Sequence, residues 1–260
     1  MSGLRSTIAT PSGKRRYVRR LFATIADRYD FITAFLSYGM DRRWKRRLLR
    51  LAALRPADRV LDLACGTGDL VFATAPHVAR AVGLDLTFRM LQLAAKRTAD
   101  SRMTSSSVRS PARPHPDVGL IAGDMLALPF HAATFDVVTT GYGIRNVPDL
   151  EQALSEIRRV LAPGGRLLSL DFNRPGNPVL RGAYLAYLTV VGSALGLALH
   201  RDPDTYRYIP ESIRNYPGAH AVARMMEAHG FIDVRVIPVL GGLMAMHVAS
   251  VPVEPPAAPP

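Results

Sequence analysis

The fold is decided by the stretch Val60-Leu61-Asp62-Leu63-Ala64-Cys65-Gly66-Thr67-Gly68-Asp69. Its first half predicts an apolar strand over Arg59 to Ala64, and its second half is a glycine loop that opens a helix. Such a loop brings the backbone close to a ligand, which makes Gly66 and Gly68 candidate binding residues. The dinucleotide-binding fingerprint requires another glycine three residues after Gly68, where this chain has Val71, so the loop disfavours NAD.

Two acidic residues flank this loop, with Asp62 before it and Asp69 after it. Carboxylates repel a phosphate and attract a cation. The pair therefore favours a ligand that carries an ammonium and a sulfonium, and S-adenosylmethionine (SAM) is such a ligand. Cys65 has no cationic neighbour in the sequence that would activate it as a nucleophile, so we interpret it as a small side chain on a tight loop.

Two further acidic residues follow the next two predicted strands. Asp85 comes after the strand Arg80 to Leu84, where a carboxylate can reach the two hydroxyls of a ribose. Capping the following helix is the alternative role for Asp85. Asp124 follows the strand Val118 to Ala122, within Gly123-Asp124-Met125, and is a candidate acceptor for the exocyclic amine of an adenine.

The remainder of the chain alternates short apolar runs with helical stretches, which is typical of parallel strands joined by crossover helices. Two more strands are expected at Phe135 to Thr140 and at Arg166 to Asp171. The last two β-rich runs, Ile232 to Leu240 and Leu243 to Val251, are separated only by Gly241-Gly242, and so short a connection requires an antiparallel hairpin. We therefore expect an α/β fold with a mostly parallel sheet that ends in a hairpin.

The formal charge of the 260-residue chain is +12, and residues 1–50 contribute +10 of it, from 13 basic and 3 acidic side chains. A basic N-terminal segment on a near-neutral body indicates docking on an anionic partner, either a lipid headgroup surface or a nucleic acid. The single cysteine excludes an internal disulfide and a cysteine-based zinc site, and it fits a reducing compartment. We expect no metal and no secretory signal.

The N-terminal part divides into two predicted segments, a disordered basic leader at 1–15 and a helical cap at 16–55. In the cap, Val18, Leu21 and Ile25 have the spacing of one helical face, and a second helix is expected from Asp41. The first 26 residues contain no acid and are rich in Arg, Ser and Thr, so a mitochondrial transit peptide is an alternative interpretation of the leader.

The main domain is expected at 56–251 and contains two unusual segments. Residues 98–117 hold five Ser and three Pro and predict a flexible insertion, and the Pro-rich tail at 252–260 is expected to be disordered. Residues 178–199 approach the length of a membrane span, but they connect two strands of one sheet, so we do not interpret them as a span. They predict either a buried crossover helix or an apolar wall for a greasy substrate.

Several motifs together resemble the ubiquinone/menaquinone biosynthesis C-methyltransferase family, within the class I SAM-dependent methyltransferase fold. The loop at 62–70 and the Pro-Gly-Gly turn at 163–165 are shared by many methyltransferases, whereas Gly143-Ile144-Arg145-Asn146-Val147 and Tyr206-Arg207-Tyr208 are more specific. The resemblance runs from about Phe22 to Val248. Its other pieces are Tyr29-Asp30, Asp41-Arg42-Arg43-Trp44-Lys45, Leu128-Pro129-Phe130, Glu211-Ser212-Ile213 and Ala245-Met246-His247.

The resemblance implies a Rossmann-like sheet of seven strands with the last one antiparallel, and SAM as co-substrate. The implied SAM contacts are Thr67, Asp85, Asp124 and Met125, to which we add Asp62, Gly66, Gly68, Met90 and Gly141. The chain departs from the family pattern at three places. Gly141 stands where the family often has Ser, Cys65 replaces a glycine, and the insertion at 98–117 is not typical.

The implied reaction is methyl transfer to a ring carbon of a prenylated benzoquinol or naphthoquinol, and the sequence does not choose between the two rings. Arg145 is too basic to act as a base, so we expect it to stabilise the developing phenolate, with Asn146 orienting a hydroxyl or water. His247 is the candidate base because it titrates near neutrality. A strand histidine with a structural role is the alternative, and Tyr208 and Asp171 are secondary candidates.

The same interpretation predicts a cytoplasmic enzyme that associates peripherally with anionic membranes through its basic N-terminal helices. A homodimer is compatible with the sequence, which does not determine the oligomeric state. A methyltransferase of soluble aromatic molecules and a non-catalytic SAM-binding protein are the alternatives. Nucleic-acid methylation is disfavoured, because the chain lacks an Asn-Pro-Pro-Tyr motif, a Pro-Cys pair and a basic stripe through its body.

Overall fold

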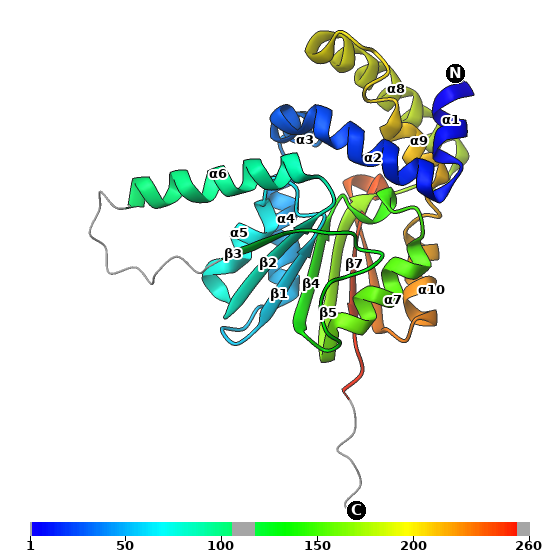
Figure 1. Cartoon of the computed structure of the whole chain (residues 1–260). Helices are drawn as coiled ribbons and strands as arrows, with labels where there is room; N and C mark the ends of the chain where they lie inside the picture. Colours follow the sequence, from blue (N-terminus) through cyan, green and yellow to red (C-terminus); the bar gives the residue numbers. More distant parts are fainter. Residues whose placement is uncertain (1, 106–117, 254–260) are drawn as a thin grey trace, which may run out of the picture.

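A computed structural model of the chain describes residues 2–105 and 118–253. Its centre is one seven-stranded sheet in the order β3-β2-β1-β4-β5-β7-β6 (Figure 1), in which only β7 runs antiparallel to its neighbours. The strands are β1 Arg59–Leu63, β2 Arg80–Asp85, β3 Val118–Ala122, β4 Phe135–Gly141, β5 Leu161–Phe172, β6 Ile232–Val239 and β7 Met244–Ser250. The predicted α/β fold with a terminal hairpin is confirmed.

The central strands are apolar along their whole length because both faces of the sheet are covered. Leu61 and Val138 pack on the face of α7 (Leu150–Val160) and α10 (Ala219–Ala228), whereas Val60 and Val137 pack on the opposite face, against α4 (Asp41–Ala52). The remaining crossover helices are α5 (Asp69–Thr74) and α6 (Phe88–Ser105). The carboxyl ends of β1, β2 and β4 therefore meet at one edge of a rigid sheet.

The N-terminal residues form a helical roof above this edge, where Figure 1 shows α2 and α3 lying across the top of the sheet. The elements are α1 Ser2–Ile8, α2 Pro11–Ile25, the short turn η1 Ala26–Arg28 and α3 Tyr29–Leu36. The structure differs from the expected disordered leader at 1–15, because helix begins at Ser2. The Thr10 hydroxyl accepts the backbone N–H of Gly13 and Pro11 opens α2, a combination that starts a helix firmly.

The structure differs from the predicted bounds at two other places, the start of β5 and the end of α6. Strand β5 begins at Leu161, before the Pro-Gly-Gly turn, with a register irregularity against β4 rather than a strand end. Helix α6 continues to Ser105, so the first part of the expected insertion at 98–117 is helical, and its remainder lies outside the described residues. Most of the expected disordered tail, residues 254–260, also lies outside them.

The long apolar segment forms one helix, α8 (Pro178–His200), followed by α9 (Tyr208–Asn215). Among the described residues it is the one helix long and apolar enough to cross a membrane, by length and composition alone. The chain enters α8 from β5 and, after α9 and α10, continues into β6 of the same sheet. Only 28% of its most apolar 18-residue window is buried, so the expectation of a buried crossover helix is wrong for most of its surface.

Candidate active site

The loop after β1 adopts the backbone conformation that its glycines allow. Gly66 has φ +56° and Gly68 has φ +94°, and a Cβ on Gly68 would lie 2.2 Å from the Phe72 ring. The Asp85 carboxylate accepts the Gly66 N–H at 2.8 Å and the Thr87 N–H at 2.7 Å. Asp85 thus ties the loops after β1 and β2 together, and it faces the hollow between them.

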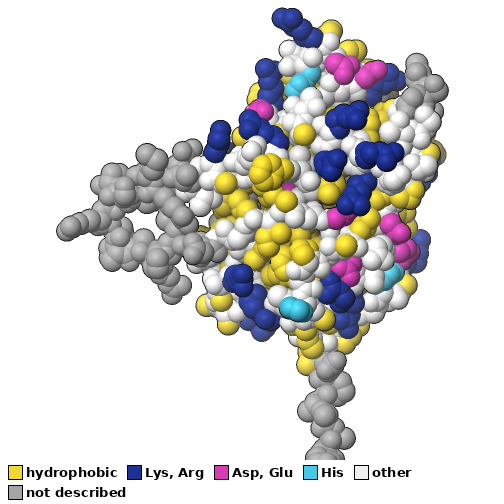
Figure 2. All heavy atoms as spheres, viewed as in Figure 1, with side chains coloured by type: hydrophobic (Ala, Val, Ile, Leu, Met, Phe, Trp, Pro, Cys, Tyr) yellow, Lys and Arg dark blue, Asp and Glu magenta, His cyan; other side chains and the backbone are white. Residues whose placement is uncertain are grey.

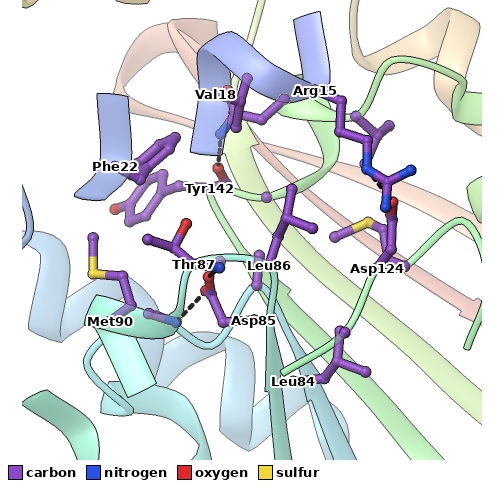
Figure 3. A pocket seen from close by; sticks show the side chains of 18 of the residues that line it. Arg15, Val18, Phe22, Leu84, Asp85, Leu86, Thr87, Met90, Asp124 and Tyr142 are labelled. Atoms are coloured by element: carbon purple, nitrogen blue, oxygen red, sulfur yellow. Dashed lines mark hydrogen bonds and ion pairs between the residues drawn. The ribbon is translucent and has the colours of Figure 1, made fainter. Parts of the chain in front are cut away.

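A first hollow, here called the loop pocket, lies at the carboxyl ends of β1, β2 and β4 and encloses about 700 Å³ including its open side. Figure 3 shows Arg15 of α2 reaching over Asp124, with 2.9 Å between the guanidinium and the carboxylate. Six of the nine residues predicted to bind SAM line this pocket, namely Gly66, Asp85, Met90, Asp124, Met125 and Gly141.

A smaller hollow, here called the acidic recess, continues from the loop pocket and shares Tyr29, Gly66, Gly141 and Tyr142 with it. The predicted residues Asp62 and Thr67 line this recess, together with Lys45 and Asp69. Gly68 lines neither the loop pocket nor the acidic recess and instead precedes α5 as its N-cap residue.

Of the two aspartates that line the acidic recess, Asp69 is paired with a cation of the described chain and Asp62 is not. Lys45 lies 2.8 Å from both Asp41 and Asp69, which keeps the pKa of Asp69 low despite its burial. Asp62 is buried and accepts only the Thr139 hydroxyl among the described side chains, at 2.8 Å, so burial raises its pKa to about 7. A cationic ligand in the recess would restore the charged form of Asp62.

Binding of a cationic ligand should therefore depend on pH through Asp62. Below pH 7 the carboxyl is protonated, so we expect SAM affinity to fall about tenfold from pH 8 to pH 6. In the ligand-free chain the sign is opposite, because a raised carboxyl pKa makes stability decline as pH rises from about 4 to 7. Calorimetry over this range measures the first effect, and Asp62→Asn should flatten it; an equally steep profile in that variant would contradict the assignment.

A third hollow, here called the apolar pocket, lies between the N-terminal roof and the start of α9 and encloses about 600 Å³ including its open side. Its walls are mostly aliphatic and aromatic, among them Leu21, Ile32 and Leu36, and Arg145 is its one strongly charged lining residue. Phe22, Tyr29 and Tyr142 line both this pocket and the loop pocket, so the two hollows adjoin across these three rings.

Arg145 is held rigidly at the floor of the apolar pocket. Its guanidinium donates to the Asp171 carboxylate and, at 3.1 Å, to the carbonyl of Tyr142, and it lies 4.7 Å from the centre of the Phe172 ring. Burial alone would lower its pKa, but the Asp171 charge outweighs burial and raises it. Arg145 is therefore a fixed cation. This agrees with the expectation from the sequence that Arg145 is too basic to act as a base.

Four buried polar atoms have no hydrogen-bond partner within the described part of the chain: Thr140 Oγ1, Arg145 Nε, Asn146 Oδ1 and Tyr208 OH. Buried polar groups are normally paired, because leaving one without a partner costs about 1–3 kcal/mol. Asn146 lines the loop pocket, whereas Arg145 and Tyr208 line the apolar pocket. These atoms are suited to a ligand that carries its own polar groups into both pockets, which fits SAM on one side and a hydroxylated ring on the other.

His247 does not reach any of these pockets, and its expected role as base is corrected here. It is 1% exposed within β7, where Nδ1 lies 2.9 Å from Ser169 Oγ and Nε2 lies 2.9 Å from the Ala219 carbonyl. Burial lowers its pKa. With both ring nitrogens engaged, His247 anchors α10 to the sheet and is structural.

Replacing His247 by glutamine should therefore affect stability and not chemistry. Loss of one of the two buried hydrogen bonds should reduce the free energy of unfolding by about 1–3 kcal/mol. We expect kcat to stay within about threefold of the wild type, since no pocket loses a group. Urea unfolding and steady-state kinetics check the two halves, and a large kcat loss in a stable variant would return His247 to the chemistry.

Two residues at the site, Tyr142 and Lys14, were not predicted from the sequence. Tyr142 lines all three hollows, has φ +62° and donates its hydroxyl to Asp41 at 2.6 Å. Lys14 of α2 donates to the carbonyls of Arg145 and Val147, at 3.1 Å and 2.6 Å. A positive φ at an aromatic residue and a long-range contact from a basic leader leave no local signal in the sequence.

Comparison with known proteins places these features in a family. The chain matches the ubiE/COQ5 methyltransferase family over residues 10–251. It is 33% identical to a demethylmenaquinone methyltransferase of Staphylococcus aureus over 243 residues, which cover 92% of this chain and 95% of that protein.

Solved structures share the fold at lower identity. A putative S-adenosyl-L-methionine-dependent methyltransferase of Methanococcus maripaludis has a TM-score of 0.60 at 18% identity, covering 91% of this chain and 95% of that one. A SAM-dependent methyltransferase of Aquifex aeolicus has a TM-score of 0.55 at 15% identity, covering 80% and 89%.

Fold and site together define a SAM-dependent methyltransferase, with the ligand-binding loops at the carboxyl edge of a Rossmann-like sheet. The match extends over nearly the whole chain and includes the roof from α2 onward and the terminal hairpin. The chain belongs to the ubiE/COQ5 methyltransferase family.

Proposed function

We propose that this enzyme transfers the methyl group of SAM to a ring carbon of a prenylated benzoquinol or naphthoquinol. The observation that carries the proposal is the pair of adjoining pockets, one acidic and polar, the other apolar with a single fixed arginine. A flat dihydroxylated ring with a hydrocarbon tail has the chemistry of the second pocket. The S. aureus relative, named a demethylmenaquinone methyltransferase, supports this substrate class.

The residues of the loop pocket and the acidic recess would hold SAM. Asp62 supplies negative charge for its ammonium and sulfonium, whereas the charge of Asp69 is shared with Lys45 and Arg97. Asp85 would accept from the ribose hydroxyls, and Asp124 from the adenine amine. Met90 and Met125 supply the apolar part of the wall. SAM itself brings an activated methyl group, which leaves with the sulfur keeping the bonding electron pair.

The residues of the apolar pocket would activate the ring. Arg145 stabilises the negative charge that grows on a quinol oxygen as its proton passes to water, and this charge makes the neighbouring ring carbon nucleophilic. The Tyr208 hydroxyl, buried and without a partner in the described chain, is placed to hold the ring oxygen, and Asn146 orients a hydroxyl or water at the boundary of the two pockets. The ring carbon then takes the methyl group and releases its hydrogen as a proton.

We also propose peripheral association of a cytoplasmic enzyme with anionic membrane, since a prenylated quinol resides in the bilayer. Figure 2 shows basic side chains gathered over α2, where Arg15, Arg16, Arg19 and Arg20 are exposed. A second basic row on α4 exposes Arg42, Arg43, Arg46, Arg47 and Arg50. Each basic residue near an anionic lipid surface contributes about 1 kcal/mol.

Parallel assays test the substrate class. The purified chain should methylate a demethylnaphthoquinol or a demethylated benzoquinol in the presence of SAM and leave simple soluble phenols unmethylated, because these lack a tail to fill the apolar pocket. The faster of the two quinols identifies the ring. Preference for a tail-free phenol would instead support an enzyme of soluble aromatic molecules.

A further inference from the structure

The outer side of α8 carries an uncharged apolar stripe that faces solvent. Val179, Val190 and Leu197 are 79%, 69% and 60% exposed, and Ala183, Ala186 and Ala194 between them are also exposed. Between Arg181 and His200 the helix has no charged residue. A contiguous exposed apolar surface on one helix marks an interaction site.

A second stripe lies on α3. Phe31, Phe35 and Tyr38 are 56%, 48% and 60% exposed at successive turns, and the Phe31 and Phe35 rings are 6.2 Å apart. The Tyr38 ring stacks on Tyr187 of α8 with 6.3 Å between centroids, so the two stripes meet. We call the combined surface the α3–α8 face.

The other side of α3 lines the apolar pocket, and the other side of α8 packs against residues that line it. Ile32, Thr33 and Leu36 of α3 line it, and Val191 and Leu195 of α8 pack on the hydrophobic cluster that contains Tyr206 and Tyr208. Helix α3 therefore has the apolar pocket on one side and the exposed apolar face on the other, and α8 lies beside it. A hydrocarbon chain that leaves the pocket between them emerges onto an apolar surface and not into water.

Charged residues of both signs border this face, and Asp27 and Asp30 are exposed next to Phe31. Arg42 and Arg43 follow Tyr38 at the start of α4, and Arg28 donates to the Leu199 carbonyl at 2.9 Å near the end of α8. Arg201 ends α8, followed by the exposed Asp202 and Asp204. The face itself has the apolar character of hydrocarbon, and the exposed arginines of α2 and α4 supply the positive charge that favours an anionic lipid surface.

We propose that the α3–α8 face inserts into the headgroup region of an anionic bilayer, with α8 parallel to the membrane plane. The prenyl tail then reaches the apolar pocket between α3 and α8. This inference rests on the proposed function only for the identity of the tail. The arginines of α2 and α4 then attract the anionic lipid headgroups, and the α3–α8 face stabilises binding by burying its apolar surface away from water.

Two double variants remove the face without touching a pocket: Phe31→Ser with Phe35→Ser, and Val190→Ser with Leu197→Ser. Val253→Ser is the matched control, because Val253 is 75% exposed and lies beside Gly164 of the Pro-Gly-Gly turn, away from the α3–α8 face. Each protein is sedimented with vesicles containing phosphatidylglycerol at low and high salt. Thermal unfolding and SAM calorimetry confirm that the variants are intact.

We expect both double variants to bind vesicles at least tenfold more weakly at high salt, where the arginine attraction is screened, and Val253→Ser to bind like the wild type. KM for a long-tailed quinol in vesicles should rise about tenfold, and turnover of a short-tailed, water-soluble quinol should stay within twofold. Unchanged vesicle binding overturns the proposal, as does conversion of a dimer to a monomer with vesicle binding retained. Absence of methyl transfer by the wild type would refute the proposed function and leave the sedimentation result standing.

Discussion

Arg145→Gln is expected to lower kcat for quinol methylation about 100- to 1,000-fold while leaving SAM affinity within about threefold. The reason is that a fixed cation in a dry pocket stabilises a developing oxyanion far better than water does. Arg145 lines the apolar pocket and not the loop pocket, so cofactor binding should be spared. Steady-state kinetics and calorimetry measure the two effects separately.

The same substitution leaves the Asp171 carboxylate buried without its guanidinium partner, and breaking a buried pair costs about 3–5 kcal/mol of stability. The double variant Arg145→Gln with Asp171→Asn is the control, because it removes the uncompensated charge and keeps an acceptor oxygen for one of the two backbone N–H groups, of Arg145 and Phe172, that donate to separate oxygens of Asp171. We expect it to recover stability but not kcat. Recovered activity would show that Arg145 only supports the fold.

Deleting residues 1–26 is expected to abolish both SAM binding and methyl transfer, although a transit peptide would be dispensable. Arg15, Val18 and Phe22 of α2 line the loop pocket, and Leu21 and Ile25 line the apolar pocket. The deletion opens both pockets to solvent. Calorimetry and activity of the purified truncated chain check this, and full activity would restore the interpretation as a cleaved leader.

A single substitution isolates the contribution of Lys14. Burial lowers the pKa of its ammonium to about 8, and its two hydrogen bonds hold the turn that carries Arg145 and Asn146. Lys14→Met should lower kcat about tenfold on a water-soluble quinol, since each charge-assisted bond is worth about 1.5–3 kcal/mol. Arg19→Ala, on the exposed side of the same helix, should have no effect in that assay.

The sheet was largely predictable because each strand is a short apolar run with clear turn residues at its ends. Strand β3 has its predicted bounds, and Gly241-Gly242 indicated the antiparallel hairpin. The start of β5 was missed because Pro163 and two glycines are typical of a turn, while the neighbouring strand edge still pairs with Leu161. The helical leader was missed because its stability comes from packing on distant residues, as the contacts of Lys14 show.

In the candidate site, too, local sequence signals could be interpreted, whereas positions that depend on long-range packing could not. The sequence could bring Asp62, Asp85 and Asp124 together because each stands near the end of a strand, and parallel strands bring their carboxyl ends to one edge. Their role in SAM binding stays a prediction. His247 was placed wrongly because titration behaviour was considered without its partners, which come from β5 and α10. The proximity of Arg145 to the apolar pocket also depends on long-range packing, since α2, α3 and α9 supply most of that wall.

The most direct test of the central claim follows the methyl group itself. The purified chain is incubated with SAM labelled as a trideuteromethyl donor and with a demethylated, prenylated quinol in vesicles, and the product is examined by mass spectrometry and NMR. We predict that the intact trideuteromethyl group appears on a ring carbon of the quinol. A label on a quinol oxygen, or no label on either the benzoquinol or the naphthoquinol, would contradict the proposed function.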